Sequence, residues 1–222
     1  MDQISFELSQ GIAKIVFTDA NDGDFRVVGA DGDVDARRMA VNRSRWTLLR
    51  QVHGSEVVTV AEPGEHNLVQ ADGAVTFEPG CVIAVTTADC APVVLVGSTG
   101  VAVVHAGWRG AFGGVIESAG RELRAGGAEP VAAVVGPCIQ PAAYEFGTTD
   151  LETLRGRFGH GVEGRTENGK PALDLHHLVV SGCLSAGWPA PERSVCTSDR
   201  SFFSHRTRSD VRRQTTAVWI ER

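Results

Sequence analysis

Three short polar segments interrupt apolar stretches of the sequence, and each contains one side chain that binds transition metals. The segments are Gln51-Val52-His53-Gly54, Thr87-Ala88-Asp89-Cys90 and His105-Ala106-Gly107-Trp108-Arg109-Gly110. Two imidazoles and one thiolate form a ligand set that suits zinc, and three protein ligands leave the fourth tetrahedral position open for water or substrate. His53, Cys90 and His105 are therefore candidate metal ligands.

The spacing of these three residues leaves other interpretations open. They lie 37 and 15 positions apart, which matches no compact zinc motif. A single histidine beside a strand is commonly a hydrogen-bonded core or surface residue, and a single cysteine is commonly a small core residue. A further interpretation is a metal-free hydrolase with Cys90 as nucleophile and His105 as base, because a neighbouring imidazole activates a thiolate.

Residues next to the candidate ligands add groups that bind substrates. The face of Trp108 can stack on a planar ring and the guanidinium of Arg109 can hold an anion, although Trp108 can equally fill the core. Asp89 can act as an acid or base, orient a ligand imidazole, or form a turn. Glycines permit sharp turns or a close approach of the backbone to a ligand. Those beside the histidines are Gly54, Gly107 and Gly110.

The elements that position these residues are predicted from apolar periodicity. Continuous apolar runs predict strands buried on both faces at 73–76, 81–87, 92–96 and 101–105. Further strands are predicted at 4–8, 12–18, 46–50, 56–60, 131–135 and 216–220. Helices are predicted at 34–43, 107–125, 149–158 and 174–186, and loops at 19–33 and 156–170. Because strands and helices alternate irregularly, the expected fold class is α+β, a mixed-sheet sandwich forming a single domain over 1–222.

The composition excludes several classes of protein. The 222 residues are 42% hydrophobic and 22% charged, as in globular proteins, and no apolar run approaches the ~20 residues of a membrane helix. A net charge of −6 without a basic run before the C-terminus offers no surface to nucleic acid. Five cysteines, an odd number, and the lack of a signal-peptide pattern at the N-terminus predict free thiols and a cytoplasmic location.

Six strings of the sequence resemble, in the same order, the laccase-domain family. They are QVHG (51–54), ADGAVT (71–76), TTADCAPVVL (86–95), HAGWRG (105–110), VGPCIQPAAYEF (135–146) and CTSDRSFFSHR (196–206). Members of this family have been called multicopper polyphenol oxidases and are now viewed largely as purine nucleoside phosphorylases with adenosine deaminase activity. A bacterial branch is called peptidoglycan editing factor. The resemblance implies an α/β/β/α sandwich whose metal ligands are His53, Cys90 and His105.

A single zinc ion fits this sequence better than a laccase copper cluster, although one copper ion is also compatible. A multicopper oxidase needs more histidines than the seven in this chain. Zinc lowers the pKa of a bound water to about 7, and the resulting hydroxide can attack C6 of adenosine. Phosphorolysis instead needs an anion cradle, for which Arg109, Arg206 and Arg213 are candidates, and a proton donor, for which Asp89 is a candidate.

The predicted function is therefore zinc-dependent phosphorolysis or deamination of adenosine and inosine, with Trp108, Arg206 and Arg213 binding substrate. The expected partners are a purine nucleoside and phosphate, with neither nucleic acid nor membrane, and the expected state is a monomer or weak homodimer. The alternatives are a metal-free cysteine hydrolase acting on a cell-wall precursor and a non-catalytic nucleoside-binding protein.

Two departures from the family pattern weaken the transfer of its activity to this chain, and the first of them favours the non-catalytic alternative. Family members carry an arginine and a Gly-Gly-Val-Ser-like turn where this chain has Asp19-Ala20-Asn21-Asp22-Gly23-Asp24. Acidic side chains there are expected to disfavour phosphate unless Arg26 compensates. The usual Thr-Gly-Arg near the end is Val211-Arg212-Arg213, in which only the last residue matches.

Overall fold

The computed structural model describes residues 1–29 and 32–222, so positions 30 and 31 of the predicted loop at 19–33 lie outside the described residues. Its strands are β1 Asp2–Leu8, β2 Gly11–Phe17, β3 Trp46–Leu48, β4 Val57–Val60, β5 Gly73–Thr76, β6 Val82–Thr87, β7 Ala91–Gly97, β8 Val101–Ala106, β9 Pro130–Val135, β10 Glu163–Arg165, β11 Pro171–Leu173 and β12 Gln214–Glu221. Its α-helices are α1 Val34–Val41, α2 Trp108–Gly113, α3 Val115–Ala125, α4 Thr148–Phe158, α5 Leu175–Ala186 and α6 His205–Arg208.

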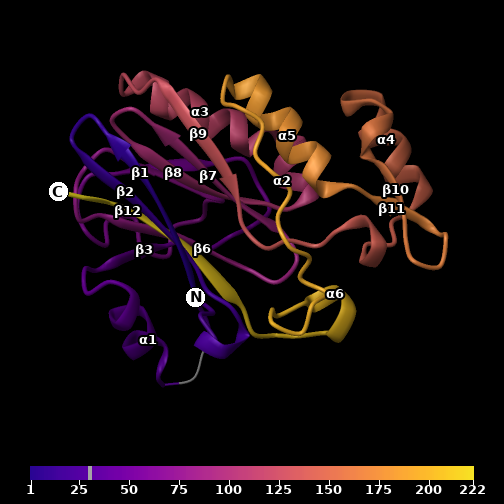
Figure 1. The fold of residues 1–222 in the computed structure, drawn as a ribbon, viewed down its shortest axis with the longest axis horizontal. Helices are drawn as coiled ribbons and strands as arrows, with labels where there is room; N and C mark the ends of the chain where they lie inside the picture. Colours follow the sequence, from indigo (N-terminus) through magenta and orange to yellow (C-terminus); the bar gives the residue numbers. More distant parts are fainter. Residues whose placement is uncertain (30–31) are drawn as a thin grey trace.

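Most of the strands belong to two five-stranded mixed sheets (Figure 1). The first sheet has the order β1-β2-β12-β6-β3 and the second the order β4-β5-β8-β7-β9. In the first sheet β3 runs parallel to β6 and the other neighbours are antiparallel. In the second sheet β4 runs parallel to β5 and the remaining pairs are antiparallel. The C-terminal strand therefore lies at the centre of the first sheet.

The two sheets pack face to face because their central strands are apolar on both sides. In β7, Val94 and Val96 belong to the core between the sheets, whereas Val93 and Leu95 pack on the opposite face, under the helices. Successive side chains of a strand point to opposite faces. The continuous apolar runs of the sequence therefore supply two cores at once.

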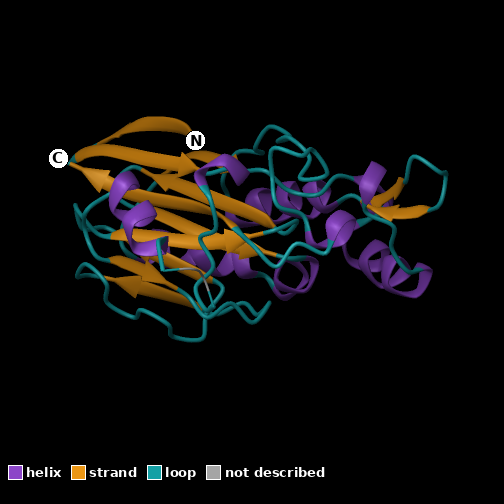
Figure 2. Ribbon diagram, turned by 90° about the horizontal axis from the view of Figure 1, so that it is seen from below, coloured by secondary structure: helices purple, strands orange, loops and turns teal. Residues whose placement is uncertain are grey.

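Helices α3 and α5 cover the outer face of the second sheet, and one short helix, α1, packs over part of the first. On the second sheet, Ile116 of α3 and Leu178 of α5 pack in the same core cluster as Leu95. On the first sheet, Val41 at the end of α1 packs beside Trp46 of β3. Figure 2 shows the sheets stacked edge-on, with α4 and the small β10–β11 sheet extending from one end. The predicted α+β class, with its mixed-sheet α/β/β/α sandwich, is confirmed.

Two predicted elements differ from the structure. The helix expected over 107–125 is divided into α2 and α3 at Gly114, whose φ of +89° is left-handed and ends the first helix. The loop expected at 156–170 contains β10, which pairs with β11 in antiparallel register. This strand is polar and only three residues long, so it carries no alternating pattern that predicts it.

In the part of the chain that the structure describes, no helix has the length and apolar character needed to cross a bilayer.

Candidate metal centre

Three neighbouring strands of the second sheet, β5, β8 and β7, have termini at the same end of the sheet, and two of the candidate ligands lie there. His105, the second-last residue of β8, is paired with Pro92 of β7, and Cys90 immediately precedes β7. Antiparallel pairing thus brings the end of one strand beside the start of the next. On the other side of β8, β5 begins at Gly73, so the residue before it, Asp72, lies at the same end of the sheet.

His53 lies at the same end of the second sheet, on a tight turn between β3 and β4. Its φ is +61°, in the left-handed region that non-glycine residues seldom adopt. The side chain of Gln51 anchors the start of the turn to β6. Its Oε1 accepts a hydrogen bond from the backbone N–H of Thr86 at 2.9 Å, and its Nε2 donates to the Thr86 carbonyl at 2.8 Å. The turn is therefore fixed to the first sheet while its histidine lies beside residues of the second.

The structure brings His53, Cys90 and His105 together. Their ligand atoms all lie within 4.8 Å of one another, and Cys90 Sγ is 3.9 Å from Nε2 of His53. The two imidazole rings meet edge to face with centroids 4.8 Å apart. Two imidazoles and a thiol at this separation form a donor set that fits one metal ion.

A buried carboxylate, Asp72, ties two of these residues together. Its Oδ1 accepts a hydrogen bond from Nδ1 of His105 at 2.8 Å. An ionised carboxylate can only accept, so Nδ1 carries the proton and Nε2 is left for a metal. The backbone N–H groups of Val52, His53 and Gly54 also donate to Asp72, at 3.0, 2.9 and 2.7 Å. One side chain therefore sets the tautomer of His105 and shapes the turn that carries His53.

Asp72 has no role among the residues predicted from sequence. The available signal is its position: it directly precedes a buried strand, as Cys90 does. Of the three roles considered for Asp89, the orientation of a ligand imidazole is made at His105 by Asp72 instead.

The absence of a side chain at Gly107 leaves room for the cluster. A Cβ atom at this position would lie 2.9 Å from Cδ2 of His53 and 3.1 Å from Sγ of Cys90. Gly107 has a φ of −68° and ψ of 163°, a conformation open to any residue. Glycine is needed here for space between ligands rather than for backbone conformation.

Electrostatic coupling makes the thiol and the buried imidazole an ion pair near neutral pH. Burial opposes ionisation of Cys90, but the imidazoles of His105 and His53 outweigh it and lower the pKa of the thiol to about 6. Burial also opposes protonation of His105, but Cys90 and Asp72 raise the pKa of its imidazole to about 9. The pair therefore holds one proton at pH 7, on the imidazole.

The cluster opens into a cavity of about 660 Å³ whose wall is rich in arginine. The arginines that line it are Arg26, Arg50, Arg109, Arg206 and Arg213. Arg26 is paired with Asp24 at 2.6 Å. Within the described residues the other four make no ion pair with a carboxylate. The wall therefore carries uncompensated positive charge, which favours an anion.

Asp89 lines the same cavity, but its carboxylate is occupied by the C-terminal segment. Its Oδ1 accepts hydrogen bonds from the hydroxyls of Thr197 and Ser204 at 2.7 and 2.6 Å. Its Oδ2 accepts from the backbone N–H of Arg206 at 2.6 Å. Asp89 has a φ of +105°, so the residue before Cys90 is held in a strained conformation. These contacts make Asp89 the anchor that places Arg206 at the cavity.

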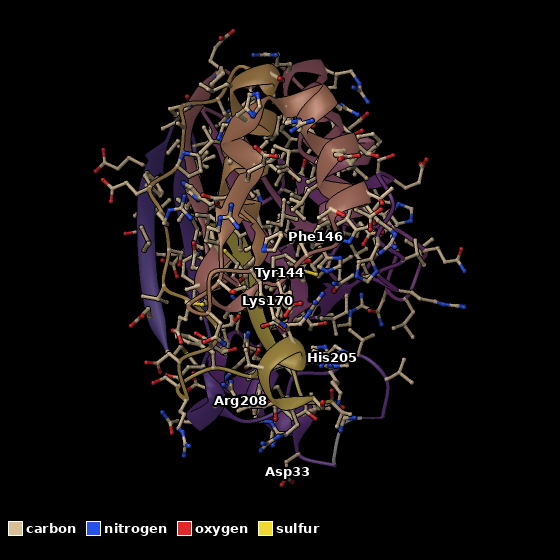
Figure 3. All side chains as sticks on the ribbon, turned by 90° about the vertical axis from the view of Figure 1, so that its right-hand side faces the viewer. Asp33, Tyr144, Phe146, Lys170, His205 and Arg208 are labelled. Carbon is tan, nitrogen blue, oxygen red and sulfur yellow. The ribbon has the colours of Figure 1, made fainter. Side chains whose placement is uncertain are left out.

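The remaining predicted substrate residues also line the cavity, together with Tyr144. Trp108 meets Phe146 edge to face at 5.4 Å, and the guanidinium of Arg109 lies 4.1 Å over the Trp108 ring. Arg206 lies 4.9 Å over the ring of Tyr144 and donates to the Glu145 carbonyl at 3.0 Å. Figure 3 shows Tyr144 and Phe146 close together, above the helix α6 on which His205 is labelled. The cavity thus pairs flat aromatic surfaces with cations.

The acidic turn at 19–24 does not line the cavity. Asp19 and Asp22 cap a short 3₁₀ helix through the N–H groups of Asn21 and Asp19. Asp24 accepts from the backbone N–H of Arg213 at 3.0 Å and pairs with Arg26, which does line the cavity. The exception expected from sequence is therefore met: Arg26 pairs with Asp24 and lines the cavity, while Asp19 and Asp22 are used in local contacts.

The mixed-sheet sandwich and its His-Cys-His cluster define a protein with a candidate metal centre in an arginine-lined cavity. The sequence profile described as "Multi-copper polyphenol oxidoreductase laccase" matches residues 16–221. The chain belongs to this family. The resemblance noted in the sequence is thereby confirmed.

Curated relatives cover most of the chain. A protein of Xylella fastidiosa (strain Temecula1) named "Purine nucleoside phosphorylase" is 35% identical over 233 residues, which cover 95% of this chain and 88% of the relative. A Streptomyces coelicolor protein with the same activity in its name is 30% identical over 223 residues, covering 95% and 92%.

Solved structures share the fold. A Bacillus licheniformis protein described as "hypothetical protein YfiH" superposes with a TM-score of 0.82 at 24% identity, covering 94% of this chain and 93% of that one. A Neisseria meningitidis protein superposes with a TM-score of 0.81 at 24% identity over the whole of both chains. At this level of identity the likeness concerns the fold alone.

Proposed function

We propose that this chain is a zinc-dependent enzyme that cleaves purine nucleosides with phosphate. The observation that carries the proposal is the lining of the cavity. It includes the cluster of His53, Cys90 and His105 and four arginines that, among the described residues, have no carboxylate partner. The names of the curated relatives support the same activity. Deamination of adenosine is a second reaction of the same site to be tested.

His53, Cys90 and His105 are the residues proposed to hold the metal. Zinc is favoured over copper because a mixed imidazole and thiolate set with one open position is typical of catalytic zinc. When bound, zinc supplies a Lewis acid that polarises a neighbouring oxygen or nitrogen. Asp72 keeps the Nε2 atom of His105 available to it.

The remaining residues are assigned by the charges and surfaces they present. Arg109, Arg206 and Arg213 hold phosphate, and Trp108 offers its face to the purine. In phosphorolysis a phosphate oxygen bonds to C1′ of the ribose as the C1′–N9 bond breaks, and the purine takes up the proton that phosphate loses. Asp89, expected from sequence to act as an acid, is instead assigned the positioning of Arg206, because three donors already occupy its oxygens.

A product assay tests this proposal. Zinc-loaded and chelator-treated protein is incubated with adenosine or inosine, with and without phosphate, and the products are separated by chromatography. The proposal expects free purine and ribose 1-phosphate only when phosphate and metal are both present. Inosine formed from adenosine without phosphate identifies deamination, and binding without any product identifies a nucleoside-binding protein.

A metal-free cysteine hydrolase is the second candidate function, favoured by one observation. The neighbouring imidazoles lower the pKa of Cys90 to about 6, which makes the thiolate available as a nucleophile near pH 7. Iodoacetamide would then abolish activity stoichiometrically while chelators leave it unchanged. Loss of activity on chelation, restored by zinc, eliminates this candidate.

Proton release on metal binding is the first prediction. At pH 7 Cys90 is a thiolate and His105 an imidazolium, because their pKa values are about 6 and about 9. Zinc binding therefore displaces about one proton from the Cys90–His105 pair at pH 7, and more as the pH falls below 6, where the thiol is also protonated. Titration calorimetry in buffers of different ionisation enthalpy measures this number. A value of zero at pH 7 contradicts the assignment.

The second prediction concerns phosphate. Arg206→Ala is expected to raise the KM for phosphate by ~10-fold or more while leaving zinc content unchanged, because one charge-assisted hydrogen bond contributes about 1.5–3 kcal/mol. Arg155→Ala is the matched control, since Arg155 lies on α4 and pairs with Glu163 at 3.3 Å. Equal effects of the two changes would remove Arg206 from the site.

A further inference from the structure

Two cysteines that the proposed reaction does not use, Cys138 and Cys196, lie directly opposite each other. They form an isolated parallel bridge: the N–H of Cys138 donates to the Val195 carbonyl and the N–H of Thr197 donates to the Cys138 carbonyl, both at 3.2 Å. Neighbouring strands lie about 4.8 Å apart. This separation falls within the range of Cα distances that a disulfide spans.

Both sulfurs contact the same residue. The backbone N–H of Gln140 lies 3.3 Å from Cys196 Sγ, and its side-chain amide nitrogen lies 3.4 Å from Cys138 Sγ. Gln140 is itself held by Arg193, which donates to its Oε1 at 2.6 Å. The two thiols therefore share one small, fixed environment.

The two thiols differ in access, which sets an order of reaction. Cys138 is buried, whereas Cys196 is partly exposed. Burial raises the pKa of the Cys138 thiol to about 12. Cys196 is thus the sulfur that an oxidant meets first, and Cys138 stands behind it as the resolving thiol.

The two cysteines lie next to residues that bind Asp89, the residue that holds Arg206 at the cavity. The residue after each cysteine bonds to Asp89: Thr197 through its hydroxyl to Oδ1 at 2.7 Å, and Ile139 through its N–H to the carbonyl at 2.8 Å. Asp89 also holds the N–H of Arg206. A bond between the cysteines would join Cys138, three residues after the end of β9, to the start of the segment that carries Arg206.

We propose that Cys138 and Cys196 form a reversible disulfide that fixes the 196–206 segment against the cavity. With hydrogen peroxide as oxidant, Cys196 Sγ attacks one peroxide oxygen, the O–O bond breaks, and one water leaves as the sulfenic acid forms. The Cys138 sulfur then attacks Cys196 Sγ, and the sulfenic oxygen leaves as a second water. Two thiols are oxidised and one peroxide is reduced, and a dithiol reverses the bond.

Peptide mapping tests this proposal without reference to enzymatic activity. The zinc-loaded chain is treated with hydrogen peroxide, alkylated under denaturing conditions and digested with trypsin. The proposal expects tryptic peptides 125–155 and 194–200 to be joined, and the joined species to disappear with dithiothreitol. Cys196→Ser abolishes it, whereas Cys183→Ala, which removes a buried thiol of α5, leaves it intact. Cys196 over-oxidised with Cys138 still free, or a link that includes Cys90, overturns the proposal.

Native-state proteolysis tests the mechanical consequence. Cleavage after Arg200 and Arg208 requires the C-terminal segment to open locally, so the disulfide is expected to slow it by ~10-fold or more. Cleavage within α4, after Arg155, serves as the internal control and stays unchanged. Equal cleavage of oxidised and reduced protein after Arg200 overturns the claim that the bond fixes this segment.

Discussion

Asp72→Asn is expected to weaken zinc binding by ~10–100-fold, the usual effect of removing a carboxylate that orients a ligand imidazole. The asparagine side chain keeps the shape of Asp72 but replaces one acceptor oxygen with a donor. Because the two oxygens accept from Nδ1 of His105 and from three backbone N–H groups, an amide nitrogen must face at least one donor. Competition with a chromophoric chelator measures the affinity.

The same change is expected to destabilise the metal-free chain by about 1–3 kcal/mol, because a buried donor loses its partner. Denaturant unfolding in the presence of chelator measures this part separately. Asp150→Asn on α4 is the control, since Asp150 is exposed and far along the chain from the cluster. If Asp72→Asn binds zinc as tightly as the unmodified chain, the carboxylate does not position His105.

Gly107→Ala is expected to reduce zinc affinity by ~10-fold or more through one added methyl group. The new Cβ would lie 2.9 Å from Cδ2 of His53 and 3.1 Å from Cys90 Sγ, so at least one of these side chains must shift. Small displacements of a ligand side chain are costly at a metal site because the coordination distances are fixed to within about 0.2 Å. Calorimetric titration with zinc measures the loss.

Gly113→Ala is the matched control for this prediction. Gly113 is the last residue of α2, the helix that Gly107 precedes, and a Cβ there would meet Ser55 Cβ at an ordinary contact distance of 3.6 Å. Alanine is also favoured over glycine in helices. Gly113→Ala is therefore expected to leave zinc affinity unchanged. Equal affinity of both alanine variants would show that Gly107 does not border the metal.

The core strands and the positions where they end could be predicted from sequence because the apolar runs that indicate them are local. The apolar run that includes Val93 to Val96 predicts a strand buried on both faces, and the structure places its alternate residues in two different cores. His53, Cys90 and His105 could be selected as candidate ligands by their residue types within polar interruptions of apolar stretches. The family resemblance supported their grouping, since residues 37 and 15 positions apart carry no spacing signal.

The contacts that organise the site could not be predicted because they depend on long-range pairing. Asp72 shows in sequence only as an acidic residue before a strand. Its bond to His105 exists only when β5 and β8 lie side by side, and its other three bonds require the turn at 52–54 to reach the start of β5. Asp89 is the opposite case: its position beside Cys90 suggests chemistry, but residues more than 100 positions later occupy its carboxylate. The acidic turn was predicted in part: Arg26 compensates Asp24 as the sequence allowed, but the contact of Asp24 with the backbone of Arg213, 189 positions later, depends on long-range pairing.

The most direct test of the central claim is the metal content of protein purified without chelator, measured by mass spectrometry of the elements. We predict about one equivalent of zinc per chain, falling close to zero in Cys90→Ala. Zinc content that is unchanged in Cys90→Ala, or metal-free protein that processes nucleosides at the full rate, would contradict the claim that His53, Cys90 and His105 form a catalytic zinc site.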